Sequence, residues 1–427
     1  MSTDAVNPDP PRYWWLKRLA VAYVLLAAGT VALRYGWYRA ARGRVGGQVA
    51  AWRAAGQPVL AGDFASPRVA DSENGAVLLR AAAQSINAIR YTDEERDVLN
   101  SRGMGAPTPA QIAVLEKVVK ARRAGLDQAR RARSSPRLDW GLNLEESILD
   151  VSLPGLNDLR TVFDLLQHAC SVAHAQADDR EALELCRDML FTSRAAGRQP
   201  FLVSSLISMS LSSGTVQSVW RIAPTLQVRD AATRRAALEL IAELLEDQHI
   251  RDSMVRAAYC ERATEMEVAQ HAGVDIVWGR NMQEPLAERF LAWWYRPIVE
   301  DDLLQMMRRA TEWARAAGAP DAPTARRMSK ARPVKSDSAN DALLCPLSRS
   351  LVTSFDPAIQ RSYSAQRDRR AAAIDLAVRL HQIDHGKLPG RVQDLVPDYL
   401  EYAPIDPTTG APLTRNLGPA TTRASPQ

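Results

Sequence analysis

The chain has 427 residues, of which 46% are hydrophobic and 24% are charged, with a net charge of +5. These proportions are ordinary for a globular protein and exclude a wholly disordered chain. The length predicts two or three domains, and the abundance of alanine, leucine and arginine over aromatic residues favours helix over sheet. The modest positive charge permits contact with acidic lipids or nucleic acid but favours neither.

After a tail at residues 1–13, the first predicted element is a transmembrane helix at residues 14–38. Its uncharged part, residues 19–33, is shorter than the about 20 residues that a bilayer span requires, so the flanks must supply the remaining length. Basic side chains near both ends can reach the lipid headgroups, and aromatic side chains suit both membrane interfaces. These residues are Lys17, Arg18, Arg34, Trp14, Trp15, Tyr35, Trp37 and Tyr38. The pattern therefore predicts that this helix holds the protein in a lipid bilayer.

A cleavable signal peptide is the competing interpretation, because Thr30 and Ala32 are small residues near the end of the apolar run. The arginines and the second aromatic group that follow favour an uncleaved anchor. Basic residues before and after the span are nearly balanced, with a slight excess after it that favours a cytoplasmic C-terminal part. Large domains can cross the membrane despite such an excess, so the charge pattern does not fix the orientation.

Residues 39–72 are predicted to connect the anchor to a helical domain at residues 73–313. Asp71 or Ser72 is the candidate N-cap of its first helix, and TPAQ predicts the start of the second, with Thr108 as N-cap and Gln111 completing a capping box. Apolar residues then recur at helical spacing between short connections, which predicts an antiparallel bundle. The hairpins resemble tetratricopeptide-like hairpins in part, without a strict repeat or the consensus residues.

Two features inside this domain are interpreted as structural. The sequence SSGT is expected to interrupt the helix that contains Leu206 and Val216. The arginine-rich segment 122–133 is expected to form a solvated helix face, because no aromatic residues interleave with it for base stacking. Nucleic acid is therefore an unlikely partner.

Glu261 and Glu265 lie four residues apart beside the apolar face of a predicted helix. Paired carboxylates can perform acid and base catalysis when burial separates their pKa values. The competing interpretation is an ion pair with Arg256, Arg262 or an arginine of a neighbouring helix. No nucleophile, metal motif or cofactor loop accompanies the two glutamates, so no catalytic residue is assigned.

Two histidine pairs are candidate metal ligands. His381 and His385 are one helical turn apart in HQIDH, but Gln382 stands where a zinc-protease motif requires glutamate. His168 and His174 are six residues apart and fall on different sides of a helix. No metal and no cofactor are assigned.

The helical pattern is lost at residues 314–343, which are predicted to be a mobile linker or loop. Residues 344–413 are predicted to contain a long helix, at about 356–385, followed by a short proline-rich extended segment. Gly386 should end this helix, and apolar residues of the extended segment should pack back onto the bundle. Residues 414–427 are predicted to be a disordered tail.

The segment AAAIDLAVRLHQIDHGKLPGRVQDLVPDYLEYAPIDPTTGAPL resembles the region after the helix in the major pseudopilins of type II secretion. Both have a helix ending in His-Gly-x-x-Pro, a short leucine-containing turn and Pro-x-Asp-Pro-x-x-Gly. The matching residues are His385, Gly386, Pro389, Leu395, Pro397, Tyr399, Pro404, Asp406, Pro407 and Gly410. The anchor lacks the glycine and glutamate of the prepilin processing signature, so the chain itself is not a pseudopilin.

The whole chain resembles a group of membrane-anchored bacterial proteins of unknown function that end in this segment. The resemblance is carried by PVLAGDFASPRVADSENGA, by LPGLNDLRTVFDLLQHACSVAHAQADDREALELCRDML and by YCERA. It implies a single-pass protein of the cell inner membrane with its helical domain outside the cytoplasm. The resemblance brings no activity and no catalytic residues.

Cys170 and Cys186 are a candidate disulfide pair. Both lie on the inner faces of helices that turn back at about Asp178, so their thiols should lie at nearly the same height. A compartment outside the cytoplasm would permit the bond. Two buried free thiols are the alternative.

These observations predict a mainly α protein, with an N-terminal transmembrane helix, an antiparallel helical bundle and a proline-rich end. The expected function is that of a membrane-tethered scaffold outside the cytoplasm that binds another envelope protein or peptide. The alternative is an envelope hydrolase or lyase that uses Glu261 and Glu265.

Overall fold

The computed structural model describes residues 13–100, 107–135, 137–144, 153, 155–271, 286–328 and 355–414. The structure is 76% helical, and no strand occurs in these ranges. The prediction of a mainly α protein with a long apolar N-terminal helix followed by a helical bundle is confirmed. The described residues divide into two units, one of residues 13–57, 268–271 and 286–307 and one drawn from the described parts of 58–267, 308–328 and 355–414.

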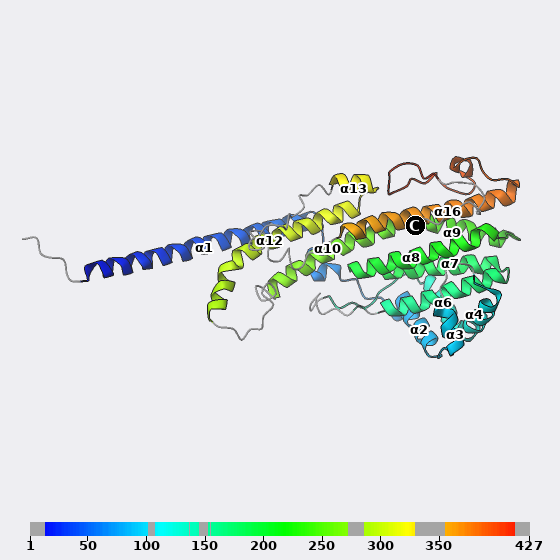
Figure 1. The fold of residues 1–427 in the computed structure, drawn as a ribbon, viewed down its shortest axis with the longest axis horizontal. Helices are drawn as coiled ribbons and strands as arrows, with labels where there is room; N and C mark the ends of the chain where they lie inside the picture. Colours follow the sequence, from blue (N-terminus) through cyan, green and yellow to red (C-terminus); the bar gives the residue numbers. More distant parts are fainter. Residues whose placement is uncertain are drawn as a thin grey trace, which may run out of the picture. The chain divides into compact units, whose positions relative to one another are not determined.

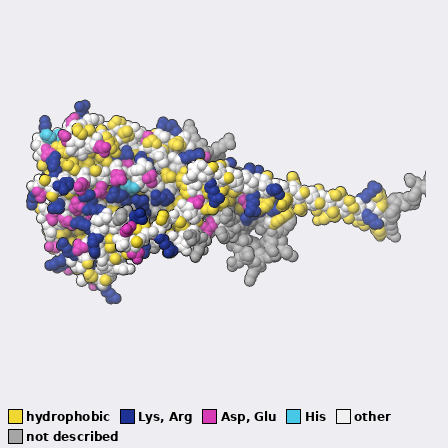
Figure 2. Space-filling view, turned by 180° about the vertical axis from the view of Figure 1, so that it is seen from behind, with side chains coloured by type: hydrophobic (Ala, Val, Ile, Leu, Met, Phe, Trp, Pro, Cys, Tyr) yellow, Lys and Arg dark blue, Asp and Glu magenta, His cyan; other side chains and the backbone are white. Residues whose placement is uncertain are grey.

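The first unit is built on helix α1 (Trp14–Ala54), which is long and apolar enough to cross a membrane. Its apolar window is wholly exposed, and Figure 2 shows hydrophobic side chains along it with Lys and Arg near both ends. The helix continues beyond the predicted span at residues 14–38 and covers residues 39–54, about half of the segment that was expected to be a connection. Val45, Val49 and Trp52 are buried on this continuation, which explains why it stays helical.

The second unit is a layered helical bundle (Figure 1). Its helices are α2 (Gly75–Asn87), α3 (Asp93–Asn100), α4 (Pro109–Ala121), α5 (Arg123–Arg133), α6 (Leu156–Ala175), α7 (Asp179–Ala196), α8 (Leu202–Ile222), α9 (Ala231–Leu245), α10 (Gln248–His271), α13 (Ala322–Met328) and α16 (Asp356–His385). Helices α2, α4 and α5 pack on α6, which packs on α7, and α7 contacts α8 and α9. Helix α16 covers α8 and α9, so one hydrophobic core runs from α2 to the C-terminal end.

Local sequence signals fix several helix ends. The capping box at Thr108 and Gln111 is present as predicted, and Asp178 caps α7 through the amide of Glu181. The N-cap of α2 is Asn74 rather than Asp71 or Ser72, because the Asn74 side chain accepts from the Ala76 amide. Gly386 ends α16 in the left-handed conformation, as predicted.

Two expectations about helix continuity were wrong. Helix α8 runs without a break through SSGT, because Gly214 lies against the ring of Phe163, where a Cβ would meet ring carbon at 2.8 Å. The predicted linker at 314–343 begins too early, since residues 314–317 belong to α12 (Leu286–Ala317) and residues 322–328 form α13. Buried alanines such as Ala317 and Ala325 hold this stretch in place. Residues 329–343 and the predicted tail from 415 onward lie outside the described residues.

The arginine-rich segment is a solvated face only in part: Arg123 and Arg131 are exposed, whereas the other three arginines make contacts within the bundle. Arg122 is buried over the ring of Tyr91, 3.8 Å from its centroid, and donates to the Ile89 carbonyl at 2.9 Å. Arg130 and Arg133 both pair with Asp188 of α7, whose side chain is 1% exposed. Arg130 and Arg133 therefore tie α5 to α7, while Arg122 ties the start of α5 to the segment after α2.

The C-terminal segment packs onto the bundle as expected. Val392, Leu395, Tyr399, Leu400 and Leu413 all belong to the main core. The turn at 404–413 closes on itself, since the Asp406 amide donates to the Ala411 carbonyl and the Leu413 amide to the Pro404 carbonyl. The segment thus supplies apolar side chains to the core.

Candidate functional site

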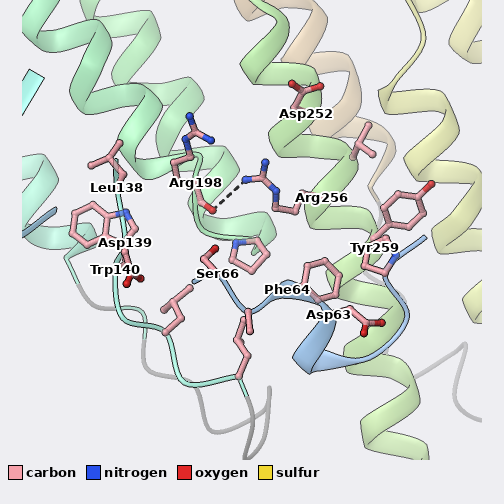
Figure 3. A pocket seen from close by; sticks show the side chains of 16 residues that line it. Asp63, Phe64, Ser66, Leu138, Asp139, Trp140, Arg198, Asp252, Arg256 and Tyr259 are labelled. Atoms are coloured by element: carbon pink, nitrogen blue, oxygen red, sulfur yellow. Dashed lines mark hydrogen bonds between the residues drawn. The ribbon is translucent and has the colours of Figure 1, made fainter. Parts of the chain in front are cut away.

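A cavity of about 520 Å³ lies in the second unit (Figure 3). Four stretches that are far apart in the sequence line it: the loop at 58–66, the segment at 138–144, residues 198–200 just after α7, and one face of α10 at 252–259. Its lining is mixed, with three aspartates and two arginines among aromatic and aliphatic side chains. A concave site of this size and mixed lining is the kind that holds a ligand or a peptide side chain.

Two aspartates of the lining serve the walls of the cavity. Asp63 accepts hydrogen bonds from the amides of Val59 and Leu60, at 2.7 and 2.9 Å, and so closes the turn of the first loop. Asp139 accepts from the Gly141 amide at 2.8 Å through one oxygen and from the Val69 amide at 3.3 Å through the other. Because backbone amides engage both carboxylates, these aspartates shape the loops that form the walls.

Trp140 forms one side of the cavity, and its position is fixed on two sides. The indole Nε1 donates to the Ala195 carbonyl of α7 at 3.0 Å. The opposite side touches Gly155, the N-cap of α6, where a Cβ would lie 2.2 Å from a ring carbon. Gly155 also has φ +81°, so glycine is required here both by its backbone conformation and by the ring.

Arg198 and Arg256 bring two positive charges to the same cavity. Arg256 donates to the Arg198 carbonyl at 3.2 Å, which places this α10 side chain against the end of α7 (Figure 3). Burial and the nearby charge of Arg198 lower the pKa of Arg256, while Asp252 acts in the opposite direction. Among the described residues the Arg198 side chain makes no ion pair or hydrogen bond, and it is exposed. An anion in the cavity would relieve the repulsion between the two guanidinium groups.

Asp252 is the only carboxylate of this lining that Coulomb attraction couples to Arg256. One of its oxygens accepts from the Gln248 side chain at 2.8 Å, and Asp252 is exposed. Asp63 and Asp139 are engaged by backbone amides, so Asp252 is the carboxylate of the lining that offsets the charge of Arg256. Arginine side chains in such a place can bind a carboxylate of a ligand.

The glutamates predicted as an acid and base pair lie elsewhere on α10. Neither Glu261 nor Glu265 is among the residues that line the cavity. Glu261 has no ion pair with an arginine among the described residues, and burial raises its pKa. Glu265 is buried near Arg262, whose pKa burial lowers to about 10 although Tyr259 and Glu265 act in the opposite direction. Arg262 itself donates to Thr311 at 2.7 Å and to the Pro58 carbonyl at 2.5 Å.

The structure also forms a chain of polar groups that sequence reasoning did not find. His174 Nδ1 lies 2.5 Å from Asp179, and its Nε2 lies 2.9 Å from the Thr225 hydroxyl. The second oxygen of Asp179 accepts from the Gln227 amide at 2.6 Å. This order of hydroxyl, imidazole and carboxylate resembles a catalytic relay, but these residues do not line the cavity. The chain ties the turn between α6 and α7 to the connection between α8 and α9.

Cys170 and Cys186 face each other across the hairpin of α6 and α7. Their sulfur atoms lie 3.6 Å apart, and both cysteines are buried and free. The hydrogen bond with Cys170 and then burial raise the pKa of Cys186. The structure places the two thiols side by side; the disulfide stays a prediction.

The rings of His381 and His385 are in contact, with centroids 4.4 Å apart and a tilt of 43° between their planes, and His381 Nδ1 lies 3.1 Å from the Lys387 carbonyl. Within the described ranges no group of three or more His, Cys, Asp or Glu side chains could hold a metal ion.

Comparison of the chain with protein families, with curated proteins and with solved structures found no match.

Proposed function

We propose that this protein is a membrane-tethered helical scaffold, with its bundle outside the cytoplasm, that binds an acidic segment of another envelope protein or peptide. The tether is α1, which is long and apolar enough to span a bilayer. The binding site is the cavity that Arg198 and Arg256 line.

The observation that carries the proposal is the pair of arginines at one end of the cavity. Arg198 has no counterion among the described residues, and Arg256 donates to backbone carbonyls rather than to a carboxylate. Arginine forms paired hydrogen bonds with carboxylates, so a glutamate or aspartate of a partner would be held in a defined orientation. Phe64, Trp140 and Tyr259 offer apolar surface for the rest of the partner segment.

A fluorescein-labelled peptide of alternating glutamate and leucine tests this site, with a lysine and leucine peptide as its charge-reversed counterpart. Fluorescence anisotropy with the detergent-solubilised protein should detect binding of the acidic peptide alone. Arg198→Glu should weaken binding tenfold or more, equivalent to about 1.4 kcal/mol, because repulsion replaces the ion pair. Arg361→Glu on the exposed side of α16 is the matched control for net charge.

Equal binding of the acidic peptide by Arg198→Glu and Arg361→Glu would reject the cavity as the site. Preference for the basic peptide would reject the proposed ligand class. Both variants replace exposed side chains, so their folding can be verified by circular dichroism before binding is compared.

The enzymatic alternative receives less support. Glu261 has a raised pKa and no arginine partner among the described residues, which suits a general acid. It is not part of the cavity lining, and neither is Glu265, so the cavity that would hold a substrate does not present them. A scaffold with a binding cavity therefore accounts for more of the site.

A further inference from the structure

The first unit holds a second aromatic group beside the anchor. Arg34 of α1 donates to the Trp293 carbonyl of α12, and its guanidinium carbon lies 3.8 Å from the centroid of the Trp293 ring. Eight residues further along α12, Asp301 forms a bidentate ion pair with Arg44, at 2.7 and 2.9 Å. Trp37 Nε1 also donates to Asp301 at 3.4 Å.

These contacts define how the first part of α12 runs along α1. Arg34 meets Trp293 at a sequence separation of 259 residues, and Arg44 meets Asp301 at a separation of 257. Because the separation stays nearly constant, the two helices run side by side in the same direction over this stretch. Each residue of α12 from Trp293 to Asp301 therefore has a counterpart on α1 at a similar height.

The position of Trp293 along the α1 axis can be compared with the end of the apolar run in the α1 sequence. The uncharged run ends at Leu33, and its large side chains are bare, with Leu25 67% and Leu33 78% exposed. Trp293 lies level with Arg34, the first charged residue after this run. In a bilayer spanned by α1, residues at this level lie where hydrocarbon gives way to lipid headgroups.

The residues of α12 at this level have the composition of a membrane interface. Trp293, Trp294 and Tyr295 follow one another, and Arg296 comes next. Trp293 is 38% exposed, and its ring centroid lies 6.2 Å from that of Trp294. Indole and phenol rings prefer the boundary between headgroups and acyl chains, because one end of each ring system is apolar and the other can donate a hydrogen bond.

We infer that Trp293, Trp294 and Tyr295 form a second membrane contact, which enters the headgroup region of the same bilayer that α1 spans. The inference rests on the proposed membrane tether, since α1 sets the depth. Its partner is a lipid surface. The membrane is then contacted by two segments of the chain that are about 260 residues apart in sequence.

Quenching of tryptophan fluorescence by brominated lipids tests the contact. The full-length protein is reconstituted in vesicles of phosphatidylcholine and phosphatidylglycerol that carry bromine at shallow or at deep acyl positions. The double variant Trp293→Phe/Trp294→Phe lacks two of the ten tryptophans and should lose part of the fluorescence that the brominated lipids quench. The loss should be larger with bromine at the shallow positions than at the deep ones. Phenylalanine keeps the aromatic ring, so the helix contacts are largely preserved.

Two further variants make the outcomes separable. Trp313→Phe is the matched negative control, because Trp313 is 5% exposed and stacks on Phe355 with centroids 4.9 Å apart. Trp14→Phe with Trp15→Phe reports on the anchor itself and should also remove a quenched component. No change in the Trp14 and Trp15 variant would refute the tether. The tether stands if the Trp14 and Trp15 variant loses a quenched component. If the Trp293 and Trp294 variant is then quenched as strongly as wild type or Trp313→Phe, the second membrane contact alone is overturned.

Discussion

Trp140 and Gly155 touch so closely that a single methyl group decides whether both can keep their places. We expect Gly155→Ala to lower the free energy of unfolding by about 3 kcal/mol, since left-handed strain and overpacking against the ring add together. Gly141→Ala is the matched control: Gly141 has φ +66° but nothing within 4 Å, so only the strain of about 1 kcal/mol applies. Urea unfolding of the detergent-solubilised protein, followed by far-ultraviolet circular dichroism, measures the free energy of unfolding of both variants. Equal losses in the two variants would contradict the close contact of Gly155 with the Trp140 ring.

Asp384 makes stability depend on acid pH. Hydrogen bonds from Arg234 and from Tyr399 hold the pKa of Asp384 at about 2, below its ordinary value of 3.8. A carboxylate with a lowered folded-state pKa stabilises the fold above pH 3.8, and this contribution is lost as the pH falls toward 2. The difference in unfolding free energy between wild type and Asp384→Asn should therefore be constant from neutral pH to about 4 and shrink below it.

Comparing Asp384 with Asp384→Asn in a protein that also carries Arg234→Met tests whether the Arg234 guanidinium lowers the Asp384 pKa. Without the guanidinium the lowering of the Asp384 pKa is smaller, so the pH-dependent difference should flatten. An undiminished pH dependence in that background would show that Arg234 is not its source.

At the scale of elements, α16 is held to α9 by a buried cation. Arg369 is fully buried and donates to the carbonyls of Glu243, Leu244 and Glu246 at the end of α9. Burial lowers the pKa of Arg369 to about 10, so the side chain stays charged at neutral pH and suits the negative end of the helix dipole. We expect Arg369→Met to cost about 3 kcal/mol, because several buried carbonyls lose their donor.

Arg367→Met provides the control for Arg369→Met on the same helix. The Arg367 side chain is 38% exposed and pairs with its neighbour Asp368. Its removal should change the unfolding free energy by no more than about 0.5 kcal/mol. Chemical denaturation of both variants measures the two effects, and a similar loss in each would contradict the capping role of Arg369.

The elements that the sequence predicted well carry their own start and stop signals. The long C-terminal helix was expected at about 356–385 and occupies those residues, because Pro357 and Gly386 mark its ends. The capping box at Thr108 is equally local. Arg122 was misjudged because its burial depends on Tyr91, a contact that helical periodicity alone does not reveal.

The cavity could not be predicted from the sequence for the same reason. Its lining comes from four stretches that only the packing of α7 and α10 against two loops brings together. Arg198 lies just after a helix end, where a lone basic residue is common, and nothing in its neighbours marks it as part of a site.

At the scale of the whole molecule, the orientation of the chain in the membrane has a direct measurement. Alkaline phosphatase fused after residue 414 should be active, because we propose that the bundle lies outside the cytoplasm. A green fluorescent protein fused at the same position should be dark in that compartment. The opposite pair of signals would place the bundle in the cytoplasm, as the slight excess of basic residues after the span suggests.

The thiols provide a second readout of the compartment. If the bundle is exported, Cys170 and Cys186 should be joined in protein alkylated and denatured without reductant, because their sulfur atoms are already 3.6 Å apart. The bond would close a loop of about 15 residues and should add about 3 kcal/mol to stability. Mass spectrometry of the linked peptide measures it, with dithiothreitol as the control. Two alkylated free thiols, together with an inactive alkaline phosphatase fusion, would contradict export of the bundle.

The core is shared between the first helix of the bundle and the last described residues of the chain. Leu79 of α2 and Leu413 belong to one continuous hydrophobic cluster, although about 330 residues of chain separate them. A ribosome that adds 5 to 20 residues per second needs roughly 15 to 70 seconds to make that length. Helix α9 ends at residue 245 and α16 begins at residue 356, so the inner faces of α8 and α9 lack this cover while about 110 of those residues are made. Newly made chains therefore carry open apolar surface until the C-terminal helix and segment emerge, and a holding chaperone would have to protect them over that interval.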